Sequence, residues 1–280
     1  MIKLIPAVFE KPWGWERWLV STHPTGRSTD PSGRSLSAIL GADYPLLVKL
    51  IRADDRLSVQ VHPDDTLAAC REHSRGKTEC WLVLDAAPGA WLLAGFRDDC
   101  TASPETLREA VRRDVQMGTL GDRLKKYPAR PGDFLYIPAG TVHAIGGGVR
   151  LLEIQQSSDI TYRLYDWGRG RELHVEKALE AIRPVPPQYI PHFAGHFECP
   201  HFTLDLVDGG GYTGGGTTDF CLVILAGQGC IQSQCAGTAS QRLLAAPEDA
   251  IFCRAREELC LADNMRALLI RAEKFHTPLP

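Results

Sequence analysis

The main pattern along the chain is a succession of short apolar segments separated by glycine, proline and aspartate. Short apolar runs bounded by turn-forming residues predict β-strands. Clear examples are residues 45–51, 81–84, 90–95, 134–137 and 149–155. Many short strands joined by turns predict a sandwich or barrel, and they disfavour a wound α/β sheet.

A few segments have the apolar spacing of helices instead. Ser-Pro-Glu at residues 103–105 supplies an N-cap, a first-turn proline and an acid suited to the helix dipole. Helical spacing follows it, and a second short helix is expected over residues 120–126. We therefore predict a helical insertion near residues 103–127 and a further helix near residues 173–182.

Clustered prolines at residues 183–188 are typical of a linker, because they stop a helix and stiffen the chain. Strand patterns resume beyond it, at residues 202–207, 220–226 and 267–272. We therefore predict one domain over residues 1–185 and a smaller all-β domain over residues 186–280.

Composition and charge exclude several classes of function. The chain has 280 residues and a formal net charge of −3, and it lacks the basic stripe of a nucleic-acid binder. Its longest apolar run, residues 220–226, is too short to span a membrane, and no secretory signal opens the sequence. The nine cysteines include no Cys-x-x-Cys pair, so we expect reduced thiols and a cytoplasmic protein.

The strongest local signal is Gly-Asp-Phe-Leu-Tyr-Ile-Pro-Ala-Gly-Thr-Val-His at residues 132–143. An apolar strand runs into a Pro-x-Gly turn, and His143 follows three residues after the second glycine. A histidine that points inward from such a corner is a good zinc ligand. From this motif alone, a core histidine satisfied by a hydrogen bond fits equally well.

Two pairs of polar residues strengthen the case for a metal site. Gln60 and His62 lie two apart on one strand and share a face, and so do Lys77 and Glu79. A glutamine oxygen, two histidine nitrogens and a carboxylate can hold a metal ion and leave a position open for water or substrate. Taken separately, Lys77 and Glu79 are typical of a solvated surface pair, so the coincidence of several same-face pairs carries the prediction.

Residues 151–163 contain a third polar cluster. Glu153 follows two leucines inside a predicted strand, where a buried carboxylate needs a partner or a purpose. Arg163 has the planar fork that clamps a phosphate or stabilises an oxyanion. A structural pair between an acid and this arginine explains the cluster equally well.

Taken in order, these motifs resemble those of the type I phosphomannose isomerases in their short bacterial form, a family of the cupin superfamily. The resemblance covers roughly residues 7 to 183 and includes Lys-Pro-Trp-Gly at 11–14 and Arg-Glu-Leu-His-Val at 171–175. It implies an all-β fold of two cupin-like β-barrel (jelly-roll) domains, with the small helical insertion in the first. It also implies that the first domain is catalytic.

The resemblance implies a role for each conspicuous residue. One zinc ion per chain would be bound by Gln60, His62, Glu79 and His143. The residues expected to contact the substrate are Trp13 and Ser58. Those expected to act in catalysis are Lys77, Glu153, Asp159 and Arg163.

The implied reaction interconverts mannose 6-phosphate and fructose 6-phosphate, so a small sugar phosphate is the expected partner. Lys77 and Arg163 compete for two tasks, which are binding the phosphate and relaying protons between the sugar oxygens. Glu153 and Asp159 are the carboxylates considered for the C–H base, and the sequence leaves that choice and the oligomeric state open.

Two other functions fit parts of the pattern. A non-catalytic cupin could bind metal and sugar as a sensor or binding module, but the metal ligands, Lys77 and Arg163 are all present together, which disfavours it. An iron-dependent cupin oxygenase is disfavoured because glutamine stands at position 60, where such a site would have histidine. Its carboxylate would also lie closer along the chain than Glu79 does.

Overall fold

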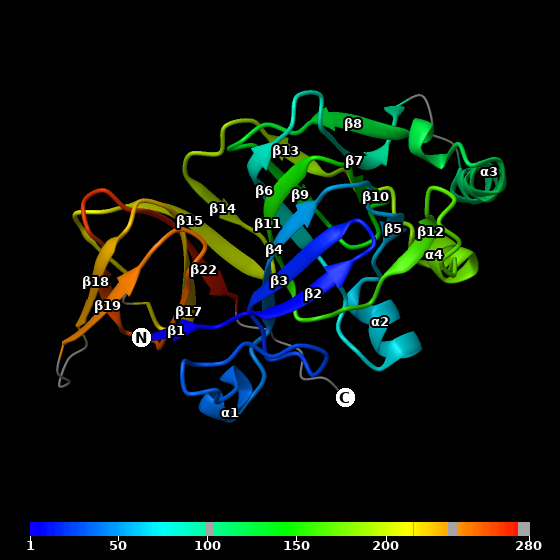
Figure 1. Ribbon diagram of the computed structural model, residues 1–280. Coiled ribbons are helices and arrows are strands. Elements are labelled where there is room, and N and C mark those ends of the chain that lie inside the picture. The colour runs from blue at the N-terminus through cyan, green and yellow to red at the C-terminus, as the bar shows by residue number, and fades with distance from the viewer. Residues whose placement is uncertain (99–102, 215, 235–239, 274–280) are drawn as a thin grey trace. The chain divides into compact units, whose positions relative to one another are not determined.

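The computed structural model in Figure 1 describes residues 1–98, 103–214, 216–234 and 240–273. These residues form mostly β-strands with few helices, as the apolar pattern predicts. Among them, no helix has both the length and the apolar character needed to cross a membrane. The seven cysteines within the described ranges are free thiols.

The residues group into two compact units. Unit 1 contains Met1–Val8, Arg17–Leu50 and the chain from Ala194 on, and unit 2 contains Phe9–Glu16 and Ile51–Phe193. These compact units do not test the predicted domain boundary after residue 185, which stays a prediction. Three strands have residues in both units: β2 (Ala7–Lys11), β3 (Gly14–Val20) and β4 (Leu46–Ala53).

Unit 2 contains a five-stranded antiparallel sheet in the order β12-β5-β10-β7-β8. Its strands are β5 (Val59–Val61), β7 (Trp91–Phe96), β8 (Leu124–Pro128), β10 (His143–Ile145) and β12 (Tyr162–Tyr165). Four strands of a second antiparallel sheet follow the order β13-β9-β6-β11. They are β6 (Glu79–Ala86), β9 (Phe134–Ile137), β11 (Val149–Gln156) and β13 (Gln188–Ile190).

Alternating side chains place the five-stranded sheet between a helical layer and the second sheet. On one face, its apolar residues share a core cluster with α2 (Asp65–Glu72), α3 (Pro104–Met117) and α4 (Val175–Ala181). On the other face, its apolar residues share a cluster with Trp81 and Leu135 of the second sheet. Val59 and Val61 belong to the helical side, so Gln60 between them points toward the second sheet.

The predicted helices are confirmed in two places. Ser103 caps α3 by accepting a hydrogen bond from the backbone nitrogen of Thr106 (3.3 Å), and the helix ends at Gly118, whose φ is 72°. A left-handed residue at this position is the commonest way to end a helix, and glycine adopts it at least cost. The helix predicted near residues 173–182 is α4.

The helix predicted over residues 120–126 is wrong beyond its first turn. The 3₁₀ helix η2 (Leu120–Arg123) stops after one turn, and the following residues form β8. This strand pairs with β7, with Tyr127 opposite Leu92. Residues 124–128 form backbone hydrogen bonds with the edge of β7. This non-local pairing outweighs their weak local preference for helix.

Besides its parts of β2, β3 and β4, unit 1 contains α1 (Leu36–Leu40) and two antiparallel sheets, in the orders β1-β20-β17-β22-β15-β14 and β16-β21-β18-β19. The first contains β1 (Ile2–Leu4), β14 (His196–Glu198), β15 (Phe202–Asp208), β17 (Phe220–Ala226), β20 (Ala250–Cys253) and β22 (Arg266–Ala272). The second contains β16 (Tyr212–Gly214), β18 (Gly229–Gln234), β19 (Gln241–Ala245) and β21 (Glu258–Cys260). One core cluster draws residues from both sheets, and β15, β17 and β22 confirm the three strands predicted there.

Gly14, which follows the predicted substrate residue Trp13, tolerates no side chain. Its φ is 145°, and a Cβ would lie 2.0 Å from the carbonyl oxygen of Arg52. We expect Gly14→Ala to lower the free energy of unfolding by about 3 kcal/mol, because backbone strain and a steric clash add. Gly33→Ala is the control, since Gly33 has a φ of 87° and open space around it. Urea unfolding measures both, and equal losses would contradict the role of the clash.

Candidate metal centre

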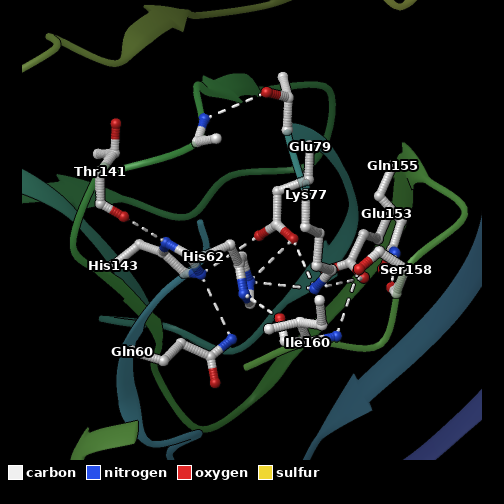
Figure 2. A network of polar contacts seen from close by, with 12 residues as sticks. Gln60, His62, Lys77, Glu79, Thr141, His143, Glu153, Gln155, Ser158 and Ile160 are labelled. Carbon is white, nitrogen blue, oxygen red and sulfur yellow. Dashed lines mark hydrogen bonds and ion pairs between the residues drawn. The ribbon is translucent and has the colours of Figure 1, made fainter. Parts of the chain in front are cut away.

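His62, Glu79 and His143 converge in unit 2, with one ligand atom from each lying within 4.8 Å of the others. His62 follows β5, while Glu79 and His143 are the first residues of β6 and β10. The site therefore takes its residues from strands of both sheets and from the residue after β5. Figure 2 shows the three side chains pointing toward one another. All three side chains are buried.

Backbone carbonyls set the tautomer of both histidines. Nδ1 of His62 donates to the carbonyl oxygen of Ile160 and Nδ1 of His143 donates to that of Thr141, each at 2.8 Å. Because Nδ1 carries the proton, the lone pair of each Nε2 faces Glu79. Metal-binding histidines are oriented in this way, by a hydrogen bond from the ring nitrogen that does not bind the metal.

The protonation states suit a metal ion. Burial, and then the nearby Lys77 ammonium, lower the pKa of His62 to about 3, and burial lowers the pKa of His143. Burial by itself would raise the pKa of Glu79, but Lys77 leads the opposing charges that hold it well below its ordinary value. Two neutral imidazoles and one carboxylate result, which are the forms that bind metals.

The close approach of the two histidines to Glu79 is favourable only with a positive ion among them. Nε2 of His62 and of His143 lie 3.3 and 3.4 Å from the two Glu79 oxygens. Among the described residues neither oxygen has a hydrogen-bond partner, and Oε2 has an ion pair with Lys77 (2.8 Å). Lone pairs that face one another at these distances repel, and a positive ion among them turns the repulsion into attraction. The donor set therefore fits a divalent metal.

Lys77 supplies one positive charge beside the triad. The residue is only 4% exposed, and Nζ lies 2.8 Å from Oε2 of Glu79, 3.1 Å from Nε2 of His62 and 3.9 Å from Oε1 of Glu153. Figure 2 shows the ammonium between the two carboxylates. A buried amine held this close to the ligands can act on a molecule bound to the metal.

Gln60 and Ser58 extend the site along β5. The Gln60 amide nitrogen lies 3.3 Å from Nε2 of His143, and its oxygen accepts a hydrogen bond from the Ser58 hydroxyl (3.2 Å). Gln60 thus contacts the triad, with its nitrogen rather than its oxygen toward His143. Its part as a fourth ligand stays a prediction.

Glu153 and Trp81 form the wall next to Lys77. The indole nitrogen of Trp81 donates to Oε2 of Glu153 (3.0 Å), across the β6–β11 pair that sets these residues opposite each other. The Trp81 ring also meets the His143 ring edge-on, with centroids 5.5 Å apart. Glu153 is buried, as its place inside an apolar strand predicts.

The structure does not bring every predicted residue into contact with the triad. Asp159 is exposed, in the loop that follows β11. Arg163 lies opposite Gln60 in the β12–β5 pair, and its Nη1 donates to the carbonyl oxygen of Glu172 (2.7 Å). Trp13 is packed in the core cluster between the two sheets. The roles of these three residues stay predictions.

Sequence reasoning missed three residues that hold the site together. Trp81 lies two residues after Glu79 on the same strand face, and this alternation was a usable signal. The carbonyls of Ile160 and Thr141 leave no such signal, because backbone groups are the same in every residue.

Fold and site together define an antiparallel β protein with a buried His/Glu/His site suited to a metal ion. The chain is 34% identical over 236 residues to "Putative mannose-6-phosphate isomerase YvyI" of Bacillus subtilis, and it covers 71% of that protein. It therefore belongs to the mannose-6-phosphate isomerase family, which confirms the resemblance seen in the motifs.

Two further comparisons agree. Over 188 residues, 60% of this chain, it is 39% identical to mannose-6-phosphate isomerase of Streptococcus mutans. The crystal structure of mannose 6-phosphate isomerase from Bacillus subtilis superposes with a TM-score of 0.78 at 25% identity, covering 96% of this chain and 98% of that one. No family model matches the chain. The matches span 57% to 62% of the length of the first curated relatives.

Proposed function

We propose that this protein is a metal-dependent aldose–ketose isomerase that interconverts mannose 6-phosphate and fructose 6-phosphate. The observation that carries the proposal is the buried group of two neutral histidines and one carboxylate with the Lys77 ammonium against it. The family relationship supports the choice of substrate, since the relatives that the chain matches are named for mannose 6-phosphate.

We propose zinc as the metal, one ion per chain, held by His62, Glu79, His143 and the amide oxygen of Gln60. Nitrogen and oxygen ligands of this kind suit zinc, and a catalytic site keeps a position for substrate. When bound, the metal supplies Lewis acidity that polarises the sugar carbonyl. Iron, which nitrogen and carboxylate ligands also suit, is the competing metal.

The chain's own residues have the remaining tasks. Isomerisation moves a proton between C1 and C2 and shifts charge between O1 and O2. Lys77 is placed to stabilise that charge or relay the oxygen-bound proton, because its ammonium lies between Glu79 and Glu153. Glu153 is the better placed of the two carboxylates considered for the C–H base, since it is buried beside Lys77 while Asp159 is exposed.

The proposal extends to substrate binding and to the architecture. Ser58 orients Gln60 and borders the site, while Arg163 and Trp13 complete the proposed substrate contacts. Two sheets share a core in each unit, which supports the proposal of two cupin-like domains. The catalytic domain is proposed over residues 1–185.

The test is conversion of fructose 6-phosphate to mannose 6-phosphate by the purified protein. We expect activity that a chelator removes and that zinc restores. Iron added to the stripped protein is the parallel trial, and recovery with iron alone would overturn the choice of zinc. Metal binding with no conversion of either sugar phosphate would overturn the isomerase proposal in favour of a sugar-binding module.

A further inference from the structure

Trp167 has a backbone conformation that bulky residues avoid. Its φ is 54°, in the left-handed region, although its neighbours Gly168 and Gly170 are the residues suited to positive φ. Such a residue persists only where surrounding contacts over-determine it, and these positions cluster at functional sites. The contacts of the Trp167 side chain therefore have to explain why it keeps this conformation.

Those contacts fasten the turn after β12 to the strand that carries the metal site. The Trp167 indole nitrogen donates to the carbonyl oxygen of Leu57 at 2.6 Å. Leu57 directly precedes Ser58 and lies two residues before β5, which carries Gln60 and is followed by His62. The Arg56 guanidinium lies 4.5 Å above the Trp167 ring centroid and adds a cation–π contact.

The same turn, which Trp167 fastens to Leu57, also binds the guanidinium of Arg163. Asp166, which is 3% exposed, accepts hydrogen bonds from Nη2 of Arg169 (2.9 Å) and Nε of Arg171 (2.8 Å). These bonds close the turn and fix the next residue, Glu172, whose carbonyl oxygen accepts from Nη1 of Arg163 (2.7 Å).

The strand register shows on which face of the sheet the Arg163 side chain lies. Arg163 lies opposite Gln60, so both side chains are on the face of the sheet that the metal triad shares. The β12–β5 pairing shifts between Arg163 and Tyr165, and such bulges re-aim side chains. Nε of Arg163 is buried and has no hydrogen-bond partner within the described part of the chain, so this donor remains for another acceptor.

We propose that Trp167 is a positioning residue for Arg163: its indole hydrogen bond to Leu57 sets the turn that aims the Arg163 guanidinium at the substrate. The inference rests on the proposed isomerase function for its kinetic consequence. The geometry of the turn itself does not depend on that function.

The kinetic test is a double-mutant cycle. Trp167→Phe removes the indole donor and keeps an aromatic ring, and we expect kcat/KM to fall about tenfold because a small misplacement of an aligned group is costly. If the loss in Trp167→Phe lies in kcat, the loss in Arg163→Lys should also lie in kcat, and the same holds for KM. Combining the two should add little beyond Arg163→Lys, because each acts through one guanidinium. Equal losses from Trp167→Phe in both backgrounds would overturn the proposal.

The matched control is Trp91→Phe. The Trp91 ring lies 6.2 Å from that of Trp167 and takes no part in the Leu57 hydrogen bond. We expect metal content to be unchanged in both variants and the control to keep kcat/KM within about twofold. If Trp167→Phe does not fold, Trp167→Tyr takes its place in the cycle.

A second measurement stands apart from activity. The Nε–H resonance of Arg163, assigned by its disappearance in Arg163→Lys, reports the setting of this buried donor. We expect it to shift or broaden in Trp167→Phe and to stay in place in Trp91→Phe. An unchanged resonance in Trp167→Phe would overturn the positioning role. A shifted resonance in a protein without isomerase activity would uphold that role and overturn only the proposed reaction.

Discussion

Lys77→Met is expected to lower kcat for isomerisation by about 1,000-fold while the protein still binds its metal. The substitution keeps the buried stem and removes the ammonium that contacts Glu79 and His62. Preorganised charges that face the reacting atoms in a buried site are worth about this much in rate. Steady-state kinetics with metal analysis of the same sample measures both effects.

A lysine outside the site provides the control. Lys177→Met removes a half-exposed ammonium that pairs with Glu72 on the surface of unit 2, and it should leave kcat unchanged. Near-normal turnover in Lys77→Met would remove Lys77 from the mechanism. Loss of metal together with turnover would mean that Lys77 acts by stabilising the Glu79 carboxylate.

His143→Ala should lower metal affinity by more than about 100-fold and remove activity at ordinary metal concentrations. Loss of an outer partner of a ligand already costs about 10- to 100-fold, and a residue that binds the metal directly should cost more. His143 places Nε2 3.4 Å from Glu79, and Thr141 fixes its tautomer. Competition with a chromophoric chelator measures the affinity.

His196→Ala is the matched control for His143→Ala. His196 is exposed in unit 1, where it pairs with Asp205 (2.8 Å). Its loss should leave metal affinity and activity unchanged. Unaltered metal affinity in His143→Ala would show that the metal binds elsewhere, and it would take the zinc proposal away from this triad.

Local patterns predicted where several residues of the candidate site lie in the fold. The alternation of Val59, Gln60 and Val61 places the glutamine on the inner face, because successive side chains of a strand point to opposite faces. The same period places Glu79 inward from the start of β6. The cap at Ser103 likewise predicts the beginning of α3, because capping depends only on neighbouring residues.

Contacts between distant segments could not be predicted in the same way. Residues 124–128 form a strand because β7 provides backbone hydrogen-bond partners for them. The local sequence of the segment does not predict this pairing. Trp167 adopts its left-handed conformation through a hydrogen bond to Leu57, 110 residues earlier. Asp159 has the spacing of a site residue, yet the loop after β11 leaves it exposed.

The sequence by itself determined the short strands, the main helices and the residues of the candidate metal site, because side-chain period, capping and chemical type are local properties. Only the tertiary structure decided how those residues act together. It brings His143 to Gln60 across 83 residues and turns both histidine lone pairs toward Glu79 through the carbonyls of Thr141 and Ile160. Those orientations depend on backbone groups, which carry no residue-specific signal and become partners only when the two sheets pack face to face.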